Sequence, residues 1–124
     1  MTGIIITERP QNIDSVYSEQ MKARLEEKLD MLPPCKSADE FFSRADEMKN
    51  VDVIFSTWGM LRLSKEQIQT YLPKLRAVFY AAGTVQYFAS PFIECGVKVF
   101  SAWAANGVPV AEMAASLILL SNKG

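Results

Sequence analysis

The sequence predicts an α/β domain built on one parallel sheet of about five strands. Short apolar segments alternate about five times with segments whose apolar residues recur at steps of three and four, the pattern of strands followed by helices. The apolar segments are nearly uniform, so we expect strands buried on both faces beneath helices. This pattern favours a doubly wound, flavodoxin-like or Rossmann-like sheet. A mixed α+β sheet is the alternative, because a strand near Cys35 is only weakly indicated.

The first half of the chain begins with an Ile-rich segment that predicts a strand at residues 3–7. Apolar residues at helical spacing then predict a helix over residues 12–31, which the proline pair at 33–34 ends. The S-A-D-E segment at 37–40 is a capping-box pattern. A second helix is therefore expected from there to about Met48.

The second half continues the alternation. Further strands are expected at residues 51–56, 76–81 and 97–100, and helices at 64–73 and 87–95. Pro73 closes the first of these helices and Gly96 ends the second. Pro109 is expected to occupy the first position of a last, apolar helix. Charged residues are sparse after Ala77, so the second half is expected to be the better buried one.

Composition narrows the classes of function. The chain has 124 residues, the size of one domain, and its 13 Lys plus Arg against 14 Asp plus Glu provide no broad basic surface for nucleic acid or an anionic membrane. It contains no histidine, which excludes Ser-His and Cys-His catalytic pairs and most zinc sites. Cys35 and Cys95 are expected to be reduced core thiols, and the start of the chain lacks a signal-peptide pattern. A cytoplasmic protein without a membrane partner is expected.

Ligands of open parallel sheets bind beyond the carboxyl ends of the strands. The loops expected there are residues 8–10, 57–60, 82–86 and 102–108. The loop at 82–86 has a glycine and little side-chain bulk, so its N–H groups and the following helix dipole suit a carboxylate or phosphate; a tight turn without a ligand is the alternative. Trp58 beside Gly59 is either a pocket wall or a cover of the core. Asn106-Gly107 is typical of a turn.

Three segments in the second half of the chain, taken together, resemble a known family. They are A-A-G-T-V-Q at 81–86, C-G-V-K-V-F at 95–100, and N-G-V-P-V-A-E at 106–112 before an apolar helix. In order and spacing they resemble the amino-terminal part of the D-isomer-specific 2-hydroxyacid dehydrogenases, from about Val51 onward. Tyr87 and its neighbours depart from the polar helix start that many members have.

The resemblance implies a domain organisation and an activity. Residues 1–105 would form a flavodoxin-like substrate-binding domain, and residues 106–124 would start the helix leading into an NAD-binding domain. The parent protein would be an oxidoreductase that interconverts a D-2-hydroxy acid and a 2-keto acid with NAD or NADP. The family's catalytic Arg, Glu and His and its G-x-G-x-x-G fingerprint lie after the V-A-E helix, and this chain has no such fingerprint. We therefore expect residues 1–124 to be inactive alone.

The resemblance also implies roles for particular residues. Its substrate-binding positions here are Trp58, Gly59, Met60, Ala82, Gly83 and Asn106. The backbone amides of Ala82 and Gly83 would hold the substrate carboxylate. Asn106 would lie near the substrate and the nicotinamide, and Val110 beside the nicotinamide ring. Residues 58–60 would occupy the variable loop that shapes specificity.

The last predicted helix is apolar on every side. Residues 108–120 place apolar side chains on every side of a helix, and about 13 residues fall short of the roughly 20 that span a membrane. We expect this helix to be covered, either by a domain of a longer enzyme from which the chain derives or by a second copy in a homodimer. An ordinary central helix of a self-contained domain is the remaining alternative.

A second class of function stays open. A non-catalytic flavodoxin-like module would serve oligomerisation or signalling. A signalling receiver needs an acidic pair after its first strand, an aspartate after the third and a lysine after the fifth, and the corresponding segments at Glu8, Ser56 and Ser101 do not supply them. An oligomerisation module therefore remains the stronger form of this alternative.

Overall fold

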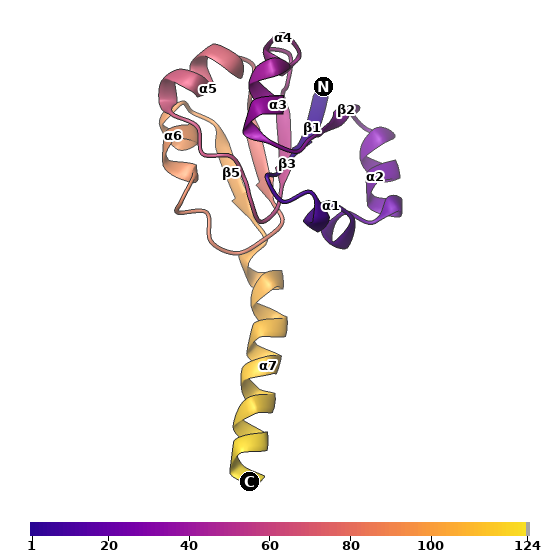
Figure 1. The fold of residues 1–124 in the computed structure, drawn as a ribbon, viewed down its shortest axis with the longest axis vertical. Helices are drawn as coiled ribbons and strands as arrows, with labels where there is room; N and C mark the ends of the chain where they lie inside the picture. The colour runs from indigo at the N-terminus through magenta and orange to yellow at the C-terminus, as the bar shows by residue number, and fades with distance from the viewer. Residues whose placement is uncertain (124) are drawn as a thin grey trace.

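The computed structural model describes residues 1–123 and confirms the α/β fold with one parallel sheet. The strands are β1 (Thr2–Ile6), β2 (Asp30–Cys35), β3 (Val53–Ser56), β4 (Ala77–Tyr80) and β5 (Lys98–Ser101). They lie in the order β2-β1-β3-β4-β5, and each neighbouring pair is parallel (Figure 1). This order reverses direction between β1 and β3, as in doubly wound sheets.

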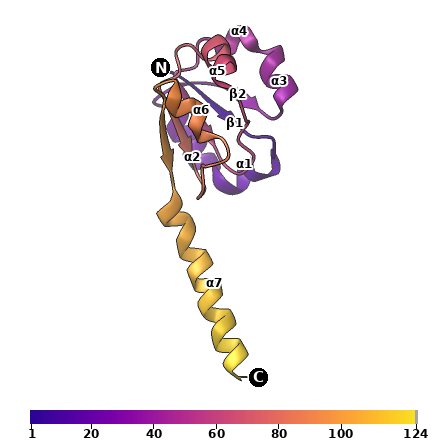
Figure 2. The ribbon, with the colours of Figure 1, turned by 90° about the vertical axis from the view of Figure 1, so that its left-hand side faces the viewer.

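Helices lie on both faces of the sheet, but unequally (Figures 1 and 2). The helices are α1 (Gln11–Val16), α2 (Glu19–Glu26), α3 (Ala38–Ser43), α4 (Ala45–Met48), α5 (Lys65–Tyr71), α6 (Ala89–Glu94) and α7 (Trp103–Lys123). The larger core cluster joins strands to α3 through α6 and includes Ile4, Ile6, Phe41, Ile68 and Phe92. The smaller cluster joins Ile5 to Ile13 and Tyr17 on the opposite face. Successive β1 residues thus face opposite layers, as the period of a strand requires.

The predicted single helix over residues 12–31 is broken after Val16 and ends at Glu26. The chain forms α1 and α2 instead, and the Ser18 side chain caps α2 by accepting a hydrogen bond from the Met21 N–H. Residues 30–35 then form β2 and include both prolines. Proline is tolerated because β2 is an edge strand paired only with β1, with an irregular register between Ile4 and Ile6.

The other early helices are shorter than predicted. The helix expected over residues 37–48 is divided at Arg44 into α3 and α4, although Ser37 does cap α3 by accepting from the Glu40 N–H. The helix expected at residues 87–95 begins at Ala89 and has six residues. The helix after Ser64 has the complete capping box, in which Ser64 and Gln67 each accept from the backbone of the other.

The last helix begins six residues before the predicted start. Trp103 opens α7, so Asn106 and Gly107 lie within a helix and the predicted turn there is wrong. Pro109 is an interior residue, whose missing N–H leaves the Ala105 carbonyl without its helical partner. Ala105 is exposed, so water can bond that carbonyl.

The expected burial of the charge-poor second half is also wrong for two regions. The residues of α7 are exposed almost throughout, and the helix projects away from the sheet (Figures 1 and 2). Phe79 and Phe100 are 40% and 48% exposed, so the face of β4 and β5 opposite α5 and α6 is not covered. Phe55, Phe79 and Phe100 stack there with ring centroids 5.5 and 5.0 Å apart.

Two adjacent phenylalanines test the assignment of the core. Phe41 is fully buried, whereas Phe42 is 37% exposed and both contact Tyr71. We expect Phe41→Ala to lower the free energy of unfolding by about 3–5 kcal/mol, because it removes transfer energy and leaves a cavity. Phe42→Ala is expected to cost about 1 kcal/mol. Urea unfolding of both variants measures the difference, and equal losses would contradict this core.

Candidate functional site

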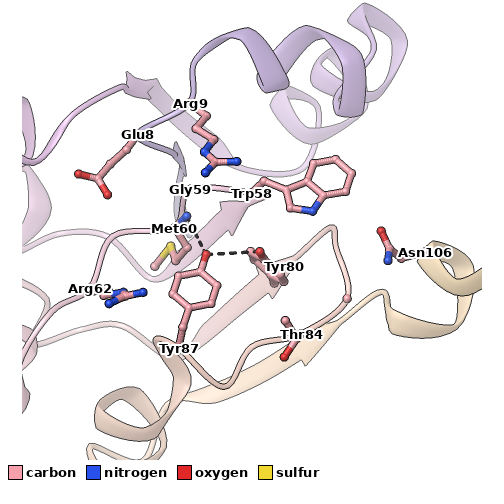
Figure 3. A pocket seen from close by; sticks show the side chains of 11 residues that line it. Glu8, Arg9, Trp58, Gly59, Met60, Arg62, Tyr80, Thr84, Tyr87 and Asn106 are labelled. Atoms are coloured by element: carbon pink, nitrogen blue, oxygen red, sulfur yellow. Dashed lines mark hydrogen bonds between the residues drawn. The ribbon is translucent and has the colours of Figure 1, made fainter. Parts of the chain in front are cut away.

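A cleft of about 740 Å³ lies at the carboxyl ends of β1, β3 and β4. We call it the strand-end cleft. Its lining residues are Glu8, Arg9, Trp58, Gly59, Met60, Arg62, Tyr80, Gly83, Thr84, Tyr87 and Asn106 (Figure 3). They come from the loops after β1, β3 and β4, the last residue of β4 and the first turns of α7. This is the edge at which parallel sheets bind ligands.

Hydrogen bonds join the loops after β1 and β3. The Thr7 hydroxyl donates to the Trp58 carbonyl over 2.8 Å and accepts from the Arg9 N–H over 3.0 Å. The Glu8 N–H donates to the Gly59 carbonyl over 2.7 Å. Gly59 has a φ of 93°, and a Cβ there would lie 2.9 Å from the Thr7 hydroxyl oxygen. Glycine is therefore required for this close approach.

A pair of tyrosines forms the floor between β3 and β4 (Figure 3). The Tyr87 hydroxyl accepts from the Met60 N–H over 3.1 Å and lies 3.3 Å from the Tyr80 hydroxyl. The pair shares one hydrogen, so the other O–H hydrogen is left for a ligand or water. Burial, followed by the hydrogen bond to Tyr87, raises the pKa of Tyr80 above its ordinary value. Tyr80 is thus a neutral hydrogen-bonding group at neutral pH rather than a base.

The loop after β4 is oriented by Ser101 at the end of β5. The Ser101 hydroxyl lies within hydrogen-bond distance of the carbonyl oxygens of Ala82 and Gly83, and can donate to either. In a trans peptide the C=O and the next N–H point in opposite directions. The N–H groups of Gly83 and Thr84 therefore point away from Ser101, and within residues 1–123 neither donates a hydrogen bond.

Asn106 faces the same loop from the first turns of α7. Its backbone N–H donates to the Ala102 carbonyl over 2.9 Å, which continues the helix directly from β5. Its side-chain nitrogen would lie 3.0 Å from a Cβ added at Gly83. Asn106 thus adds a side-chain amide beside Gly83.

The cleft has a positive balance of charge. Its charged lining residues are Glu8, Arg9 and Arg62, one acid against two bases. The Arg62 guanidinium lies 5.3 Å from the centroid of the Tyr87 ring, a cation–π distance. Cations therefore outnumber anions in the lining, which suits an anionic ligand.

Five of the predicted substrate residues line this cleft: Trp58, Gly59, Met60, Gly83 and Asn106. Ala82 is fully buried and is not a lining residue; Thr84 lines the cleft beside Gly83 instead. Val110 is 64% exposed on α7 and lies outside the lining. The helix dipole expected to favour an anion at residues 82–84 is too distant and too weak, because α6 begins only at Ala89 and has six residues.

Sequence reasoning missed several lining residues. It placed Glu8 and Arg9 in a strand-end loop without assigning them a role, and it noted Tyr87 only as a departure from the family pattern. It overlooked Arg62 and Tyr80. The proximity of Arg62 to the variable loop at residues 58–60 was an available signal.

No family model matches this chain, and no curated protein matches it in sequence. Within residues 1–123 no group of three or more His, Cys, Asp or Glu side chains gathers as a metal site. The properties of the strand-end cleft therefore rest on its own geometry.

α7 is long and apolar enough to cross a membrane by length and composition. The length of about 13 residues predicted for this helix is wrong, because α7 has 21 residues. Glu112 lies one position from its centre, where a carboxylate is costly in hydrocarbon.

The conformation of Gly59 provides a test of the cleft. Gly59→Ala adds both a left-handed backbone penalty and contacts of 2.9–3.1 Å with Thr7 and Arg9. Gly96→Ala is the matched control, because Gly96 has a φ of 79° but nothing lies within 4 Å of its Cβ position. We expect a loss of about 1–2 kcal/mol of unfolding free energy for Gly96→Ala and a larger loss for Gly59→Ala. Thermal or urea unfolding measures both, and equal losses would contradict the close packing at Gly59.

Proposed function

We propose that this domain binds the substrate of an NAD(P)-dependent oxidoreductase that interconverts a D-2-hydroxy acid and a 2-keto acid. The observation that carries the proposal is the pair of unbonded N–H groups at Gly83 and Thr84, turned away from Ser101 beside the Asn106 amide. Two N–H donors and a side-chain amide are suited to a carboxylate. The resemblance of residues 81–86 and 106–112 to the dehydrogenase family supports the same ligand.

The other lining residues have consistent roles in this proposal. Trp58 is 44% exposed and supplies an apolar wall, and buried Met60 is held through its N–H by Tyr87. The remaining tyrosine O–H can donate to a hydroxyl or keto oxygen beside the carboxylate. The protein's part is to bind and orient the acid. The nicotinamide cofactor, which supplies hydride chemistry, would be bound by a further domain reached through α7.

Ser101 gives the test of carboxylate binding. Titration of the ¹⁵N-labelled chain with D-lactate or pyruvate is expected to shift the Gly83 and Thr84 amide resonances. Ser101→Ala releases the Ala82 and Gly83 carbonyls, so we expect binding about fivefold weaker, the effect of one hydrogen bond.

Ser90→Ala is the matched control for this titration, because the Ser90 hydroxyl is exposed and donates only to Glu94. It is expected to bind the acids like the unchanged chain. Failure of both acids to move the Gly83 and Thr84 resonances at millimolar concentration would contradict the proposal.

A second candidate function is dimerisation through α7, which the exposure of this helix favours. Its large exposed apolar residues are Trp103, Val108, Val110, Met113, Leu117, Ile118, Leu119 and Leu120. So large an apolar surface marks an interaction site. The same molecule leaves Phe79 and Phe100 exposed on the uncovered sheet face, which is apolar and so suits the apolar side chains of such a helix.

The connection between β5 and α7 favours a second copy as the occupant of that face. Ala102 alone separates the two elements, whereas a helix that packs back on its own sheet follows a loop of about two to six residues. The helix of a second copy has no such restriction, and a reciprocal exchange is self-complementary about a twofold axis. Lys98 is exposed on the same side of β5 as Phe100, and α7 carries the acidic Glu112, so the charges also match.

The oligomeric state tests this second candidate. We expect the unchanged chain to be a dimer by light scattering, and the double variant Leu117→Lys/Leu120→Lys to be a monomer, because buried lysines oppose the contact. Phe79→Ser/Phe100→Ser is expected to give the same result, since it alters the receiving face.

Ile93→Lys is the control for a surface lysine, because Ile93 is 59% exposed on α6 away from both surfaces. It is expected to remain dimeric. An unchanged chain that is monomeric at tens of micromolar, or a phenylalanine variant that remains dimeric, would contradict the exchange.

A further inference from the structure

The strand-end cleft holds two arginines beyond what a monocarboxylate requires. Arg62 and Arg9 are both exposed lining residues, and among residues 1–123 neither forms an ion pair within 4.0 Å. Arg44, by contrast, is paired with both Glu40 and Glu47. The guanidinium donors of the two cleft arginines are therefore available to a ligand.

Neither arginine is positioned by bonding its guanidinium group to an acidic side chain. The Arg62 guanidinium lies over the Tyr87 ring, and the hydrogen bonds to Met60 and Tyr80 fix that ring. The backbone of Arg9 is positioned by its N–H, which donates to the Thr7 hydroxyl. The Arg62 side chain, held over a fixed ring, loses less conformational freedom when it binds an anion.

Arg62 is separated from the amide end of the cleft, and Arg9 lies between the two ends. Figure 3 shows Asn106 and Thr84 at one end and Arg62 at the other, with Tyr80 between them and Arg9 along the upper wall. A carboxylate at the Gly83 and Thr84 amides therefore leaves Arg62 free for another group of the same ligand. Glu8 offsets one of the two positive charges, so the lining keeps a net charge of +1.

We propose that the acid bound by this cleft carries a second anionic group, a carboxylate or a phosphate, held by Arg62 and Arg9. This inference rests on the proposed function and specifies its substrate class. Arginine suits either group, because its planar fork of N–H donors matches the oxygens of both. The second group would extend the ligand along the tyrosine floor toward the Arg62 end.

Pairs of ligands that differ by one anionic group test the inference. D-Malate adds a carboxylate to D-lactate, and 3-phospho-D-glycerate adds a phosphate to D-glycerate. In NMR or calorimetric titrations of the full chain, at least one acid with the second anionic group is expected to bind about tenfold more tightly than its parent acid. The two pairs distinguish a carboxylate from a phosphate, and the advantage is expected to shrink in high salt.

Arginine variants assign the effect. Arg62→Gln and Arg9→Gln are each expected to reduce binding of the acid with the second anionic group about threefold or more, and to weaken binding of the parent acid less. Arg76→Gln is the control, because Arg76 is also exposed but directly precedes β4, at the opposite edge of the sheet. Circular dichroism checks that each variant is folded.

The outcomes separate this inference from the proposed function. If the parent acids bind at Gly83 and Thr84 and the acids with a second anionic group bind no better, the inferred second group is wrong and the carboxylate site stands. An advantage that persists in both cleft variants, or that Arg76→Gln also removes, overturns the assignment to Arg62 and Arg9. If none of the acids binds, both proposals fail.

Discussion

The cleft depends on the register of four parallel strands. Ile6, Ser56, Tyr80 and Ser101 are successive partners across β1, β3, β4 and β5, so all four strands end in one row. Their following loops consequently start at the same edge. A slip of one residue in any strand would turn its side chains to the opposite face and move its loop out of the row. The uniformly apolar strands and the hydrogen bonds of Thr7 and Gly59 oppose such a slip.

Much of the fold could be predicted, because uniformly apolar strands and helical periodicity are local signals. The errors concern features that tertiary context decides. The prolines of β2 would end a helix in isolation, but the edge of the sheet accepts them as a strand. Pro109 would start a helix, but exposed Ala105 allows it in the interior of α7. The apolar composition after Ala77 predicts that these residues are buried, but it does not identify the surface that covers them.

The residues of the candidate site likewise fall into those that the sequence could place and those that it could not. Trp58, Gly59, Gly83 and Asn106 could be placed in it, because loops that follow parallel strands meet at one edge. Tyr80 could not, because it ends an apolar strand in which the sequence does not distinguish one face from the other. Arg62 depends on the path of an irregular loop and on contact with Tyr87, which follows it by 25 positions. Such contacts between loops have no periodic signature.

The start of α7 connects the strand-end cleft with the exposed apolar surface of the helix. Asn106 lies against Gly83 in the cleft, while the same rigid helix carries Leu117 and Leu120 beyond it. A contact that shifts α7 must also shift Asn106 unless the helix bends near Pro109, where one helical hydrogen bond is missing. If a partner that binds α7 changes the position of Asn106, the partner changes the affinity of the cleft for its ligand. By linkage, the ligand then changes the affinity of α7 for that partner by the same factor. Pro109 therefore determines how strongly the cleft and the apolar helix are coupled.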